Sequence, residues 1–317
     1  MGPEHQVDPV VRRRVFVVGV PRSGTTLVQS LLAAHSQVTS FTESHFFSRH
    51  FRPLSWWPHA LLTHDPLPRA EEFLKENGSR ENGSDEHGLD GDQGTYLADL
   101  RRGIPPKVLR PLASRRVARK LLDLLDWLAI DRGASTWVEK TPAHLRYLPL
   151  LEGLAEEGQT VHCVHVVRQG LEVVASLHTA SRQWDRAYDL ATCVTRWNHE
   201  VALSLHRLRR PRRPGVFDHG VTYEALTTRP EETLARLLDA LGLPWEDGIL
   251  ERHGESAGRL VTPAEVWKQG VERVVRPSAT SHQVLTDRQR TAVRAGLRND
   301  LYRRVERLLE ARRGPRP

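Results

Sequence analysis

The segment from Arg13 to His35, RRVFVVGVPRSGTTLVQSLLAAH, decides how the rest of the chain is interpreted. Four apolar residues, Val15 to Val18, predict a buried strand, and the residues from Leu27 onward have helical spacing. The turn between them, Gly19 to Thr26, has the glycine spacing of a phosphate-binding loop, G-x-x-x-x-G-K-[ST], but Thr25 stands where that pattern has lysine. A nucleoside triphosphatase needs this lysine on its β- and γ-phosphates, so we expect an anion of a different kind.

Gly24 is the residue that lets the backbone of this turn approach an anion closely. The free N–H groups at the start of the following helix point their partial positive charge toward the same place. The alternative is an ordinary glycine turn between a strand and a helix. Two glycines, a threonine pair and a strand-to-helix context together favour the anion site.

The composition is that of a soluble globular protein, with 317 residues, 39% of them hydrophobic and 27% charged. We predict one domain over residues 1–317, without a membrane span or a secretory signal, in the cytoplasm. Cys163 and Cys193 are embedded in apolar segments and lack the spacing of metal ligands. They are therefore expected to be buried free thiols in a reducing compartment.

The net charge of +7 raises the question of nucleic-acid binding. Five of the 46 basic residues are lysines and the other 41 are arginines, a skew typical of a GC-rich bacterial genome. The arginine clusters at 207–214 and at the C-terminus lack interleaved aromatic residues, which weakens a single-strand-binding interpretation. We expect a solvated turn and a solvated helix tail there, and no nucleic-acid partner.

Strands and helices alternate along most of the chain. Apolar strands are expected in TWVEK, in VHCVHVV and over 215–221, with helical patterns between them, and Thr228 is the expected cap of a later helix. This order predicts an α/β fold in which a parallel β-sheet is flanked by helices on both faces. Residues 52–110 are rich in Pro, Gly and acidic residues, and we expect a mobile insertion or lid there.

The second strong signal is the end of the strand VHCVHVV, where Arg168 follows. A nucleoside triphosphatase often ends such a strand with an Asp that holds magnesium. An arginine instead suggests an anion site, although a surface salt bridge is the simpler alternative. Ser176 lies about two helical turns further on and could share the ligand of Arg168.

The loop PRSGTT, Arg168 with Ser176, the segment WVEKTP and the segment VTYEAL appear in the order found in a known family. Together they resemble the sulfotransferases that use 3′-phosphoadenosine-5′-phosphosulfate (PAPS), especially the bacterial and tyrosylprotein branch. The similarity runs in order from Val15 to about Leu241 and skips residues 52–110. It implies a P-loop-like sulfotransferase fold, PAPS as the donor, 3′-phosphoadenosine-5′-phosphate (PAP) as the product and no metal. The reaction would be transfer of a sulfuryl group to an acceptor hydroxyl.

The same resemblance implies a set of residues that bind the donor. The loop would hold the 5′-phosphosulfate, and Arg168 and Ser176 would hold the 3′-phosphate. Two departures from the family pattern are Gln169 after that arginine, where Asp is usual, and Ala180, where the tyrosylprotein branch has Arg. The donor-binding set is Arg22, Ser23, Gly24, Thr25, Thr26, Arg168, Ser176, Tyr223 and Arg276.

The catalytic residues implied by the resemblance are Glu43, His45, Lys140 and Arg22. Glu43 falls at the position of the family's catalytic base, while His45 falls at an arginine of the tyrosylprotein branch and has the better ordinary pKa for a base. Lys140 and Arg22 would stabilise the transferring sulfonate. The structural alternative is that Glu43 caps the following helix and His45 packs in the wall.

Two rival functions remain open at this stage. One is a magnesium-dependent nucleotide kinase or triphosphatase with Glu139 as a metal ligand, and the other is a non-catalytic nucleotide- or nucleic-acid-binding module. The acceptor is also open among a small metabolite, a sugar, a lipid and a peptide tyrosine, as is a homo-oligomeric state. Five aromatic residues could form an apolar acceptor wall or belong to the core: Phe46, Phe47, Phe51, Trp56 and Trp57.

Overall fold

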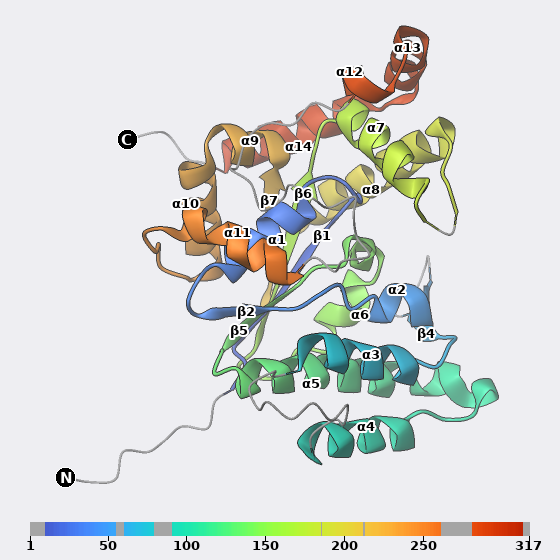
Figure 1. Ribbon diagram of the computed structural model, residues 1–317, viewed down its shortest axis with the longest axis vertical. Coiled ribbons are helices and arrows are strands. Elements are labelled where there is room, and N and C mark those ends of the chain that lie inside the picture. Colours follow the sequence, from blue (N-terminus) through green and yellow to red (C-terminus); the bar gives the residue numbers. More distant parts are fainter. Residues whose placement is uncertain are drawn as a thin grey trace.

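A five-stranded parallel sheet forms the centre of the protein (Figure 1). The structure is a computed structural model that describes residues 10–54, 60–78, 91–184, 186–211, 213–260 and 281–312. The strand order is β2-β5-β1-β6-β7, so the sequence-based prediction of a parallel α/β sheet is confirmed. The strands are β1 (Arg13–Gly19), β2 (Val38–Ser40), β5 (Thr136–Glu139), β6 (Thr160–Val167) and β7 (Val216–Thr222).

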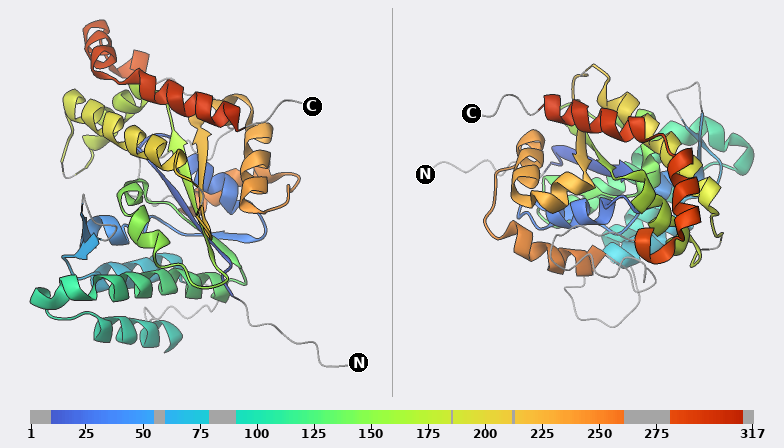
Figure 2. Two further views of the ribbon diagram at one scale, coloured as in Figure 1. Left: turned by 180° about the vertical axis from the view of Figure 1, so that it is seen from behind. Right: turned by 90° about the horizontal axis from the view of Figure 1, so that it is seen from above.

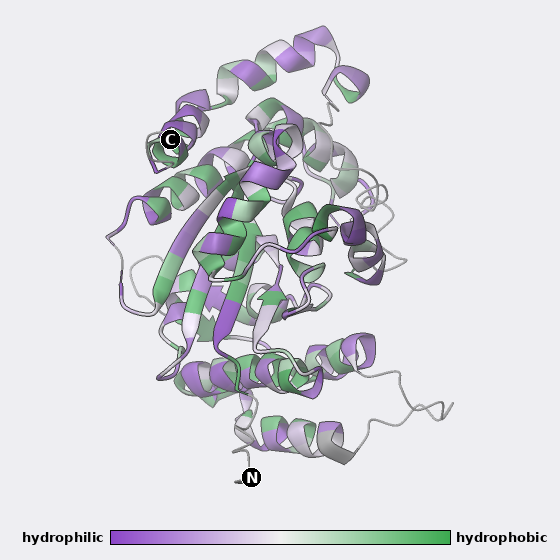
Figure 3. Cartoon of the chain, turned by 90° about the vertical axis from the view of Figure 1, so that its left-hand side faces the viewer, coloured by the Kyte–Doolittle hydropathy of each residue, from purple (hydrophilic) through white to green (hydrophobic). Residues whose placement is uncertain are grey.

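Strand β1 lies in the middle of the sheet because it is apolar on both faces. Val15 and Val17 belong to the hydrophobic cluster on one face, whereas Phe16 and Val18 belong to the cluster on the other. Successive side chains of a strand point to opposite faces, so a continuous apolar run requires cover on both. In Figure 3, hydrophobic residues gather in the middle of the molecule, and the outermost helices are mostly hydrophilic.

Helices α1 (Thr25–Ala33), α10 (Pro230–Leu241) and α11 (Ile249–Leu260) cover one face of the sheet (Figure 1). The short helix α9 (Tyr223–Thr228) follows β7 directly and leads into α10. Thr228 does not cap α10, as the sequence had suggested, because it is the last residue of α9 and donates its hydroxyl to the Glu224 carbonyl at 2.7 Å. Arg229 takes the cap position instead.

The opposite face carries a second group of helices (Figure 2). Their packing is centred on fully buried Trp197, whose indole N–H donates to the Arg168 carbonyl at 3.0 Å. This bond ties the end of β6 to the helix beside it. The helices are α7 (Gly170–Ser181), α8 (Leu190–Leu208), α12 (Ser281–Val284), α13 (Asp287–Gly296) and α14 (Asn299–Ala311).

A further helical layer lies below the sheet in Figure 1 and contains much of the stretch predicted to be a mobile insertion. Its described parts are folded, and Phe73, Leu74 and Leu100 are fully buried in one cluster with Phe16 and Trp137 of the sheet. The single domain over residues 1–317 and the movement of this layer as a lid both stay predictions. The layer consists of α2 (Phe46–His50), the hairpin β3 (Phe51–Pro53) and β4 (Ala60–Leu62), α3 (Leu67–Asn77), α4 (Gly91–Gly103), the 3-10 helix η1 (Lys107–Ala113) and α5 (Ser114–Asp131).

Short helical turns η2 (Pro142–Arg146) and α6 (Leu148–Glu152) connect β5 to β6. Both cysteines are buried free thiols, as expected, and burial raises the pKa of Cys193 to about 11. Arg207 differs from the expected solvated turn: it is buried and lies 3.2 Å from Asp218. Among the described helices, none has the length and apolar character needed to cross a bilayer.

Candidate active site

The loop between β1 and α1 is held in its shape by two glycines that lie against neighbouring elements. Gly19 has a φ of 151°, and a Cβ atom there would lie 2.4 Å from the Val166 carbonyl oxygen of β6. Gly24 has a φ of 95°, and its Cβ would lie 2.5 Å from a ring carbon of Tyr223. A larger residue at position 19 would push the loop away from the sheet, and one at position 24 would push it away from α9. Close packing therefore explains why the sequence has glycine at both positions.

The same loop offers polar groups to an anion. The hydroxyl of Ser23 is buried and has no hydrogen-bond partner within the described part of the chain. Thr25 and Thr26 are buried in the first turn of α1, and no side chain caps that helix. Buried polar groups and the N–H groups of a helix start are normally satisfied. The loop therefore offers hydrogen-bond donors to a bound anion.

Arg168, Ser176 and Arg22 come together at the end of β6. The Nε of Arg22 donates to the hydroxyl of Ser176 at 3.1 Å, and a guanidinium nitrogen of Arg168 donates to the Arg22 carbonyl at 3.4 Å. Arg168 also lies over the ring of Tyr223, with its guanidinium carbon 4.1 Å from the ring centre. Arg22 has a φ of 74°, which is uncommon for a residue other than glycine and is a feature of functional loops.

Glu43, His45 and Lys140 form a second group at the same edge of the sheet as this loop. Glu43 follows β2 and Lys140 follows β5, and because these strands pair in parallel with Ser40 opposite Val138, both side chains leave the same edge of the sheet. The Lys140 ammonium donates to one oxygen of the Glu43 carboxylate, and His45 Nε2 lies 3.3 Å from the other.

Burial sets the protonation state of His45, whose pKa it lowers to about 4. The imidazole is therefore neutral at pH 7. The alternative in which Glu43 caps α2 does not occur, since His45 occupies the cap position and no side chain makes the capping bond.

Glu139, the last residue of β5, was the candidate metal ligand of the kinase interpretation. One of its oxygens accepts from the hydroxyls of Ser44 at 2.8 Å and Thr141 at 2.6 Å, and His144 Nδ1 lies 3.0 Å from the other. Burial alone would raise the pKa of this carboxyl, but His144, Thr141 and Ser44 lower it below its ordinary value. The carboxylate thus links the segments that carry Glu43 and Lys140. Both of its oxygens have partners within the protein.

Arg69 of α3 is a residue of this site that the sequence interpretation missed. Its guanidinium donates to the carbonyls of Glu43 at 2.6 Å and Ser44 at 2.9 Å, and to both oxygens of the Glu76 carboxylate at 2.9 and 3.0 Å. Thr42 donates its hydroxyl to the same Glu76. Helix α3 therefore fixes the backbone on which the candidate base is carried.

The aromatic residues proposed for an acceptor wall belong to the core where the structure describes them. Phe46, Phe47 and Phe51 are at most 3% exposed, and Phe46 packs against the ring of Phe73 with 5.0 Å between ring centres. The core alternative is therefore correct for these three. Trp56, Trp57 and the predicted donor-binding residue Arg276 lie outside the described residues.

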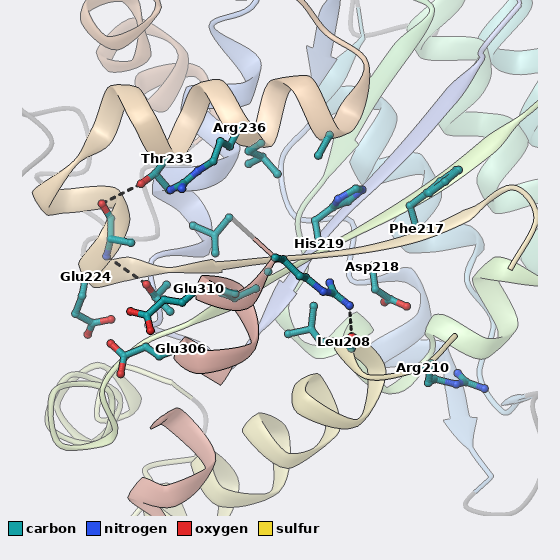
Figure 4. Close-up of a pocket in the computed structure, with 18 of the residues that line it drawn as sticks. Leu208, Arg210, Phe217, Asp218, His219, Glu224, Thr233, Arg236, Glu306 and Glu310 are labelled. Carbon is teal, nitrogen blue, oxygen red and sulfur yellow. Dashed lines mark hydrogen bonds between the residues drawn. The ribbon is translucent and has the colours of Figure 1, made fainter. Parts of the chain in front are cut away.

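A cavity of about 580 Å³ lies along the outer edge of β7, between α9, α10 and α14 (Figure 4). It contains none of the predicted site residues. Figure 4 shows the hydroxyl of Thr233 donating to the Ala225 carbonyl at 3.1 Å at one end of it. Oppositely charged side chains, among them Arg236 and Glu306, share its lining, so the cavity has no single charge preference.

Within the described residues, one group of three potential metal ligands has its ligand atoms within 4.8 Å of one another: Glu152, Cys163 and Asp218. Arg207 forms ion pairs with both carboxylates of this cluster, to Asp218 at 3.2 Å and to Glu152 at close contact. A guanidinium therefore already supplies the positive charge that these carboxylates need.

Two curated proteins are similar to this chain over most of its length. Protein-tyrosine sulfotransferase A of Caenorhabditis elegans is 21% identical over 263 residues, which make up 83% of this chain and 58% of that protein. Protein-tyrosine sulfotransferase of Drosophila melanogaster is 23% identical over 263 residues, or 83% of this chain and 44% of that protein. The chain thus spans about half the length of these relatives.

Solved structures give the same fold. The sulfotransferase domain of the Curacin biosynthetic pathway superposes with a TM-score of 0.54 at 17% identity, covering 97% of this chain and 100% of that one. The sulfotransferase domain of the Synechococcus PCC 7002 olefin synthase gives 0.50 at 18% identity, covering 99% and 98%. The family model described as "Sulfotransferase family" matches residues 14–247. With its motifs in order on this fold and most of its length matched, the chain belongs to the sulfotransferase family.

Proposed function

We propose that this chain transfers the sulfuryl group of PAPS to a hydroxyl of an acceptor, with Glu43 as the base. The observation that carries the proposal is the placement of the Glu43 carboxylate, bonded to buried Lys140, at the sheet edge where the phosphate-binding loop also ends. Transfer of a sulfuryl group to a hydroxyl requires a base that accepts the hydroxyl proton and a cation that stabilises the developing negative charge. Both groups are present at the carboxyl ends of the parallel strands, where ligands of such sheets bind.

Glu43 accepts the proton of the acceptor hydroxyl while that oxygen forms its bond to sulfur and the bond between sulfur and the leaving phosphate oxygen breaks. A carboxylate that accepts from an ammonium group is in its charged form, the form that a base needs. His45 is less suited to this task because burial disfavours the imidazolium that it would have to become. We assign it to the wall of the acceptor site.

Lys140 and Arg22 stabilise the charge that develops on the sulfonate and on the leaving oxygen. Lys140 is 1% exposed, and charges in such a dry site interact more strongly than in water. Arg22 is fixed by its bond to Ser176 and by the bond from Arg168 to its carbonyl, so little reorganisation is needed during transfer.

The donor, when bound, supplies an activated sulfuryl group, and the chain's own residues bind and orient it. Ser23, Thr25 and Thr26 would hold the 5′-phosphosulfate, with Gly24 allowing the close approach of the backbone. Arg168 and Ser176 would hold the 3′-phosphate, and Tyr223 would contact the nucleotide. Support comes from the buried hydroxyl of Ser23 and from the guanidinium of Arg168 stacked on Tyr223.

The test uses the full chain, radiolabelled PAPS and a set of hydroxylated acceptors: a sugar, a simple phenol, a tyrosine peptide and a sterol. We expect label transfer to at least one of them in excess chelator, because Thr25 and Arg168 stand where a magnesium-dependent enzyme has lysine and aspartate. We also expect PAP, without metal, to raise the melting temperature. Stabilisation by ATP with magnesium but not by PAP would overturn the proposal and favour the kinase.

A further inference from the structure

The 3-10 helix η1 exposes a cluster of large aliphatic side chains. Val108 is 81% exposed, Leu109 47% and Leu112 87%. Six large apolar side chains are exposed in the described residues, and these are three of them, while the others are scattered. Scattered exposed apolar residues are normal, but a cluster on one turn marks an interaction site. We call residues Lys107–Leu112 the η1 tip.

The chain around the tip is strongly basic. Residues 101–120, RRGIPPKVLRPLASRRVARK, contain eight Lys or Arg and no Asp or Glu. Lys107 on the tip itself has no ion-pair partner among the described side chains. Arg115 and Arg116 donate to the carbonyls of Gly153 and Gly103, and neither forms an ion pair with a carboxylate in the part of the chain that the structure describes.

The five other cations of this stretch do have acidic partners. Arg101 lies 3.6 Å from Glu71, Arg102 lies 3.6 Å from Asp99 and Arg110 lies 3.4 Å from Asp65, and the first two of these arginines are 72% and 73% exposed. Pairs at such distances on the surface are weak. The eight cations of the stretch have four carboxylate partners in all among the described residues, so positive charge is in excess around the exposed aliphatic side chains.

The tip projects from the molecule. Figures 1 and 2 show η1, between α4 and α5, at the outermost end of the helical layer in each view. Protruding aliphatic side chains suit insertion into the boundary between lipid headgroups and acyl chains, and flanking Lys and Arg suit an anionic leaflet. A nucleic-acid site would use aromatic side chains for stacking, and protein interfaces are enriched in aromatic residues and depleted of lysine.

From this combination we infer that the η1 tip docks on an anionic lipid surface. Val108 and Leu112 enter the headgroup boundary, and Lys107, Arg115 and Arg116 lie against the anionic headgroups. The inference does not depend on the proposed sulfuryl transfer, since no residue of the tip belongs to the candidate active site.

The test is co-sedimentation of the full chain with vesicles at low and high salt. We expect binding to phosphatidylcholine vesicles that contain phosphatidylglycerol, weakening as salt rises, and little binding to pure phosphatidylcholine. The double variant Val108→Ser with Leu112→Ser should lower the partition coefficient by about tenfold. Lys107→Glu should lower it by about fivefold or more.

Matched controls come from exposed residues elsewhere. Val284→Ser changes an apolar side chain that is 39% exposed at a distant helix and should leave vesicle binding unchanged. All of these positions are solvent-exposed, so thermal melts should match those of the parent chain.

Absence of binding to anionic vesicles at low salt would overturn the inference, as would equal binding by the serine double variant. Light scattering tests for a second copy of the chain at the tip. If the parent chain is a dimer that does not bind vesicles and the serine double variant is a monomer, the tip is a contact between two copies and the inference is wrong. RNA could also compete with the vesicles for the chain and bind the serine double variant as well as the parent chain. That result would show that the basic residues bind a polyanion, and it would also overturn the inference.

Discussion

Glu43 and His45 are two residues apart, and we propose different chemical roles for them. Glu43→Gln keeps the shape and a hydrogen bond to Lys140 but removes the basicity, so kcat should fall by roughly 10²- to 10⁴-fold with little change in PAP affinity. His45→Gln should cost much less and should keep the acidic limb of the pH-rate profile. The reverse order of losses would make His45 the base.

Arg168 is the residue on which donor affinity should depend most. Its charge has contacts to the Arg22 carbonyl and the Tyr223 ring, both at the proposed 3′-phosphate site. Arg168→Ala should weaken PAP binding by about 2 to 4 kcal/mol, measured by calorimetry, with a nearly unchanged fold. Arg303→Ala, which changes an exposed arginine of α14, is the control. Equal affinity in the Arg168 variant would show that the nucleotide binds elsewhere.

At the scale of elements, helix α3 holds the backbone of the segment that carries Glu43, the proposed base. Arg69→Met removes the donors to the Glu43 and Ser44 carbonyls, so that segment should lose its fixed position. We expect kcat to fall by about 10- to 100-fold while PAP affinity stays the same, because the phosphate-binding loop does not contact α3 through this residue. Partial recovery in Arg69→Lys would support positioning. Arg116→Met, on exposed α5 surface, is the control, and a PAP affinity that falls in parallel with kcat would indicate general unfolding instead.

The elements that could be predicted from sequence are those whose signal is local. The continuous apolar runs of β1 and β6, and the glycine turn after β1, carry their information within about ten residues. The position of Arg168 at a strand end follows from the same local pattern. These patterns predicted the parallel sheet, which is confirmed, and they place the proposed donor site at its edge.

The rest depends on contacts between distant parts of the chain. Arg69 lies in a stretch rich in Pro, Gly and acidic residues, and nothing there indicates that its guanidinium reaches Glu43. Arg207 looked solvated because its neighbours in sequence are basic, yet it is buried beside Asp218. Glu139 was considered a metal ligand, since only the folded chain brings Ser44 and His144 to its carboxylate.

At the scale of the whole molecule, buried neutral histidines make stability depend on pH. Burial, followed by the charges of His219 and Arg13, lowers the pKa of His162 to about 3. The unfolded chain takes up a proton below the ordinary pKa of 6.5 and the folded chain does not, so stability falls as the pH drops from 6.5 toward 3.

Urea unfolding at two pH values checks this. Between pH 7 and pH 5 the His162 contribution is about 2 kcal/mol, and His162→Gln should reduce the difference in unfolding free energy by that amount. His206 is exposed, and His206→Gln should leave the difference unchanged. An undiminished pH dependence in His162→Gln would mean that His162 is protonated in the folded protein.

The junction of Arg22, Ser176, Arg168 and Tyr223 joins four segments of the chain, two of which are 154 positions apart in sequence. A nucleotide at that junction would act as a reversible cross-link between the loop after β1, the end of β6, α7 and α9. Separation of these segments would then require release of the ligand, so saturating PAP should slow digestion by a protease that cleaves only transiently opened chains. Protease resistance would thus report nucleotide occupancy even while the acceptor is still being sought.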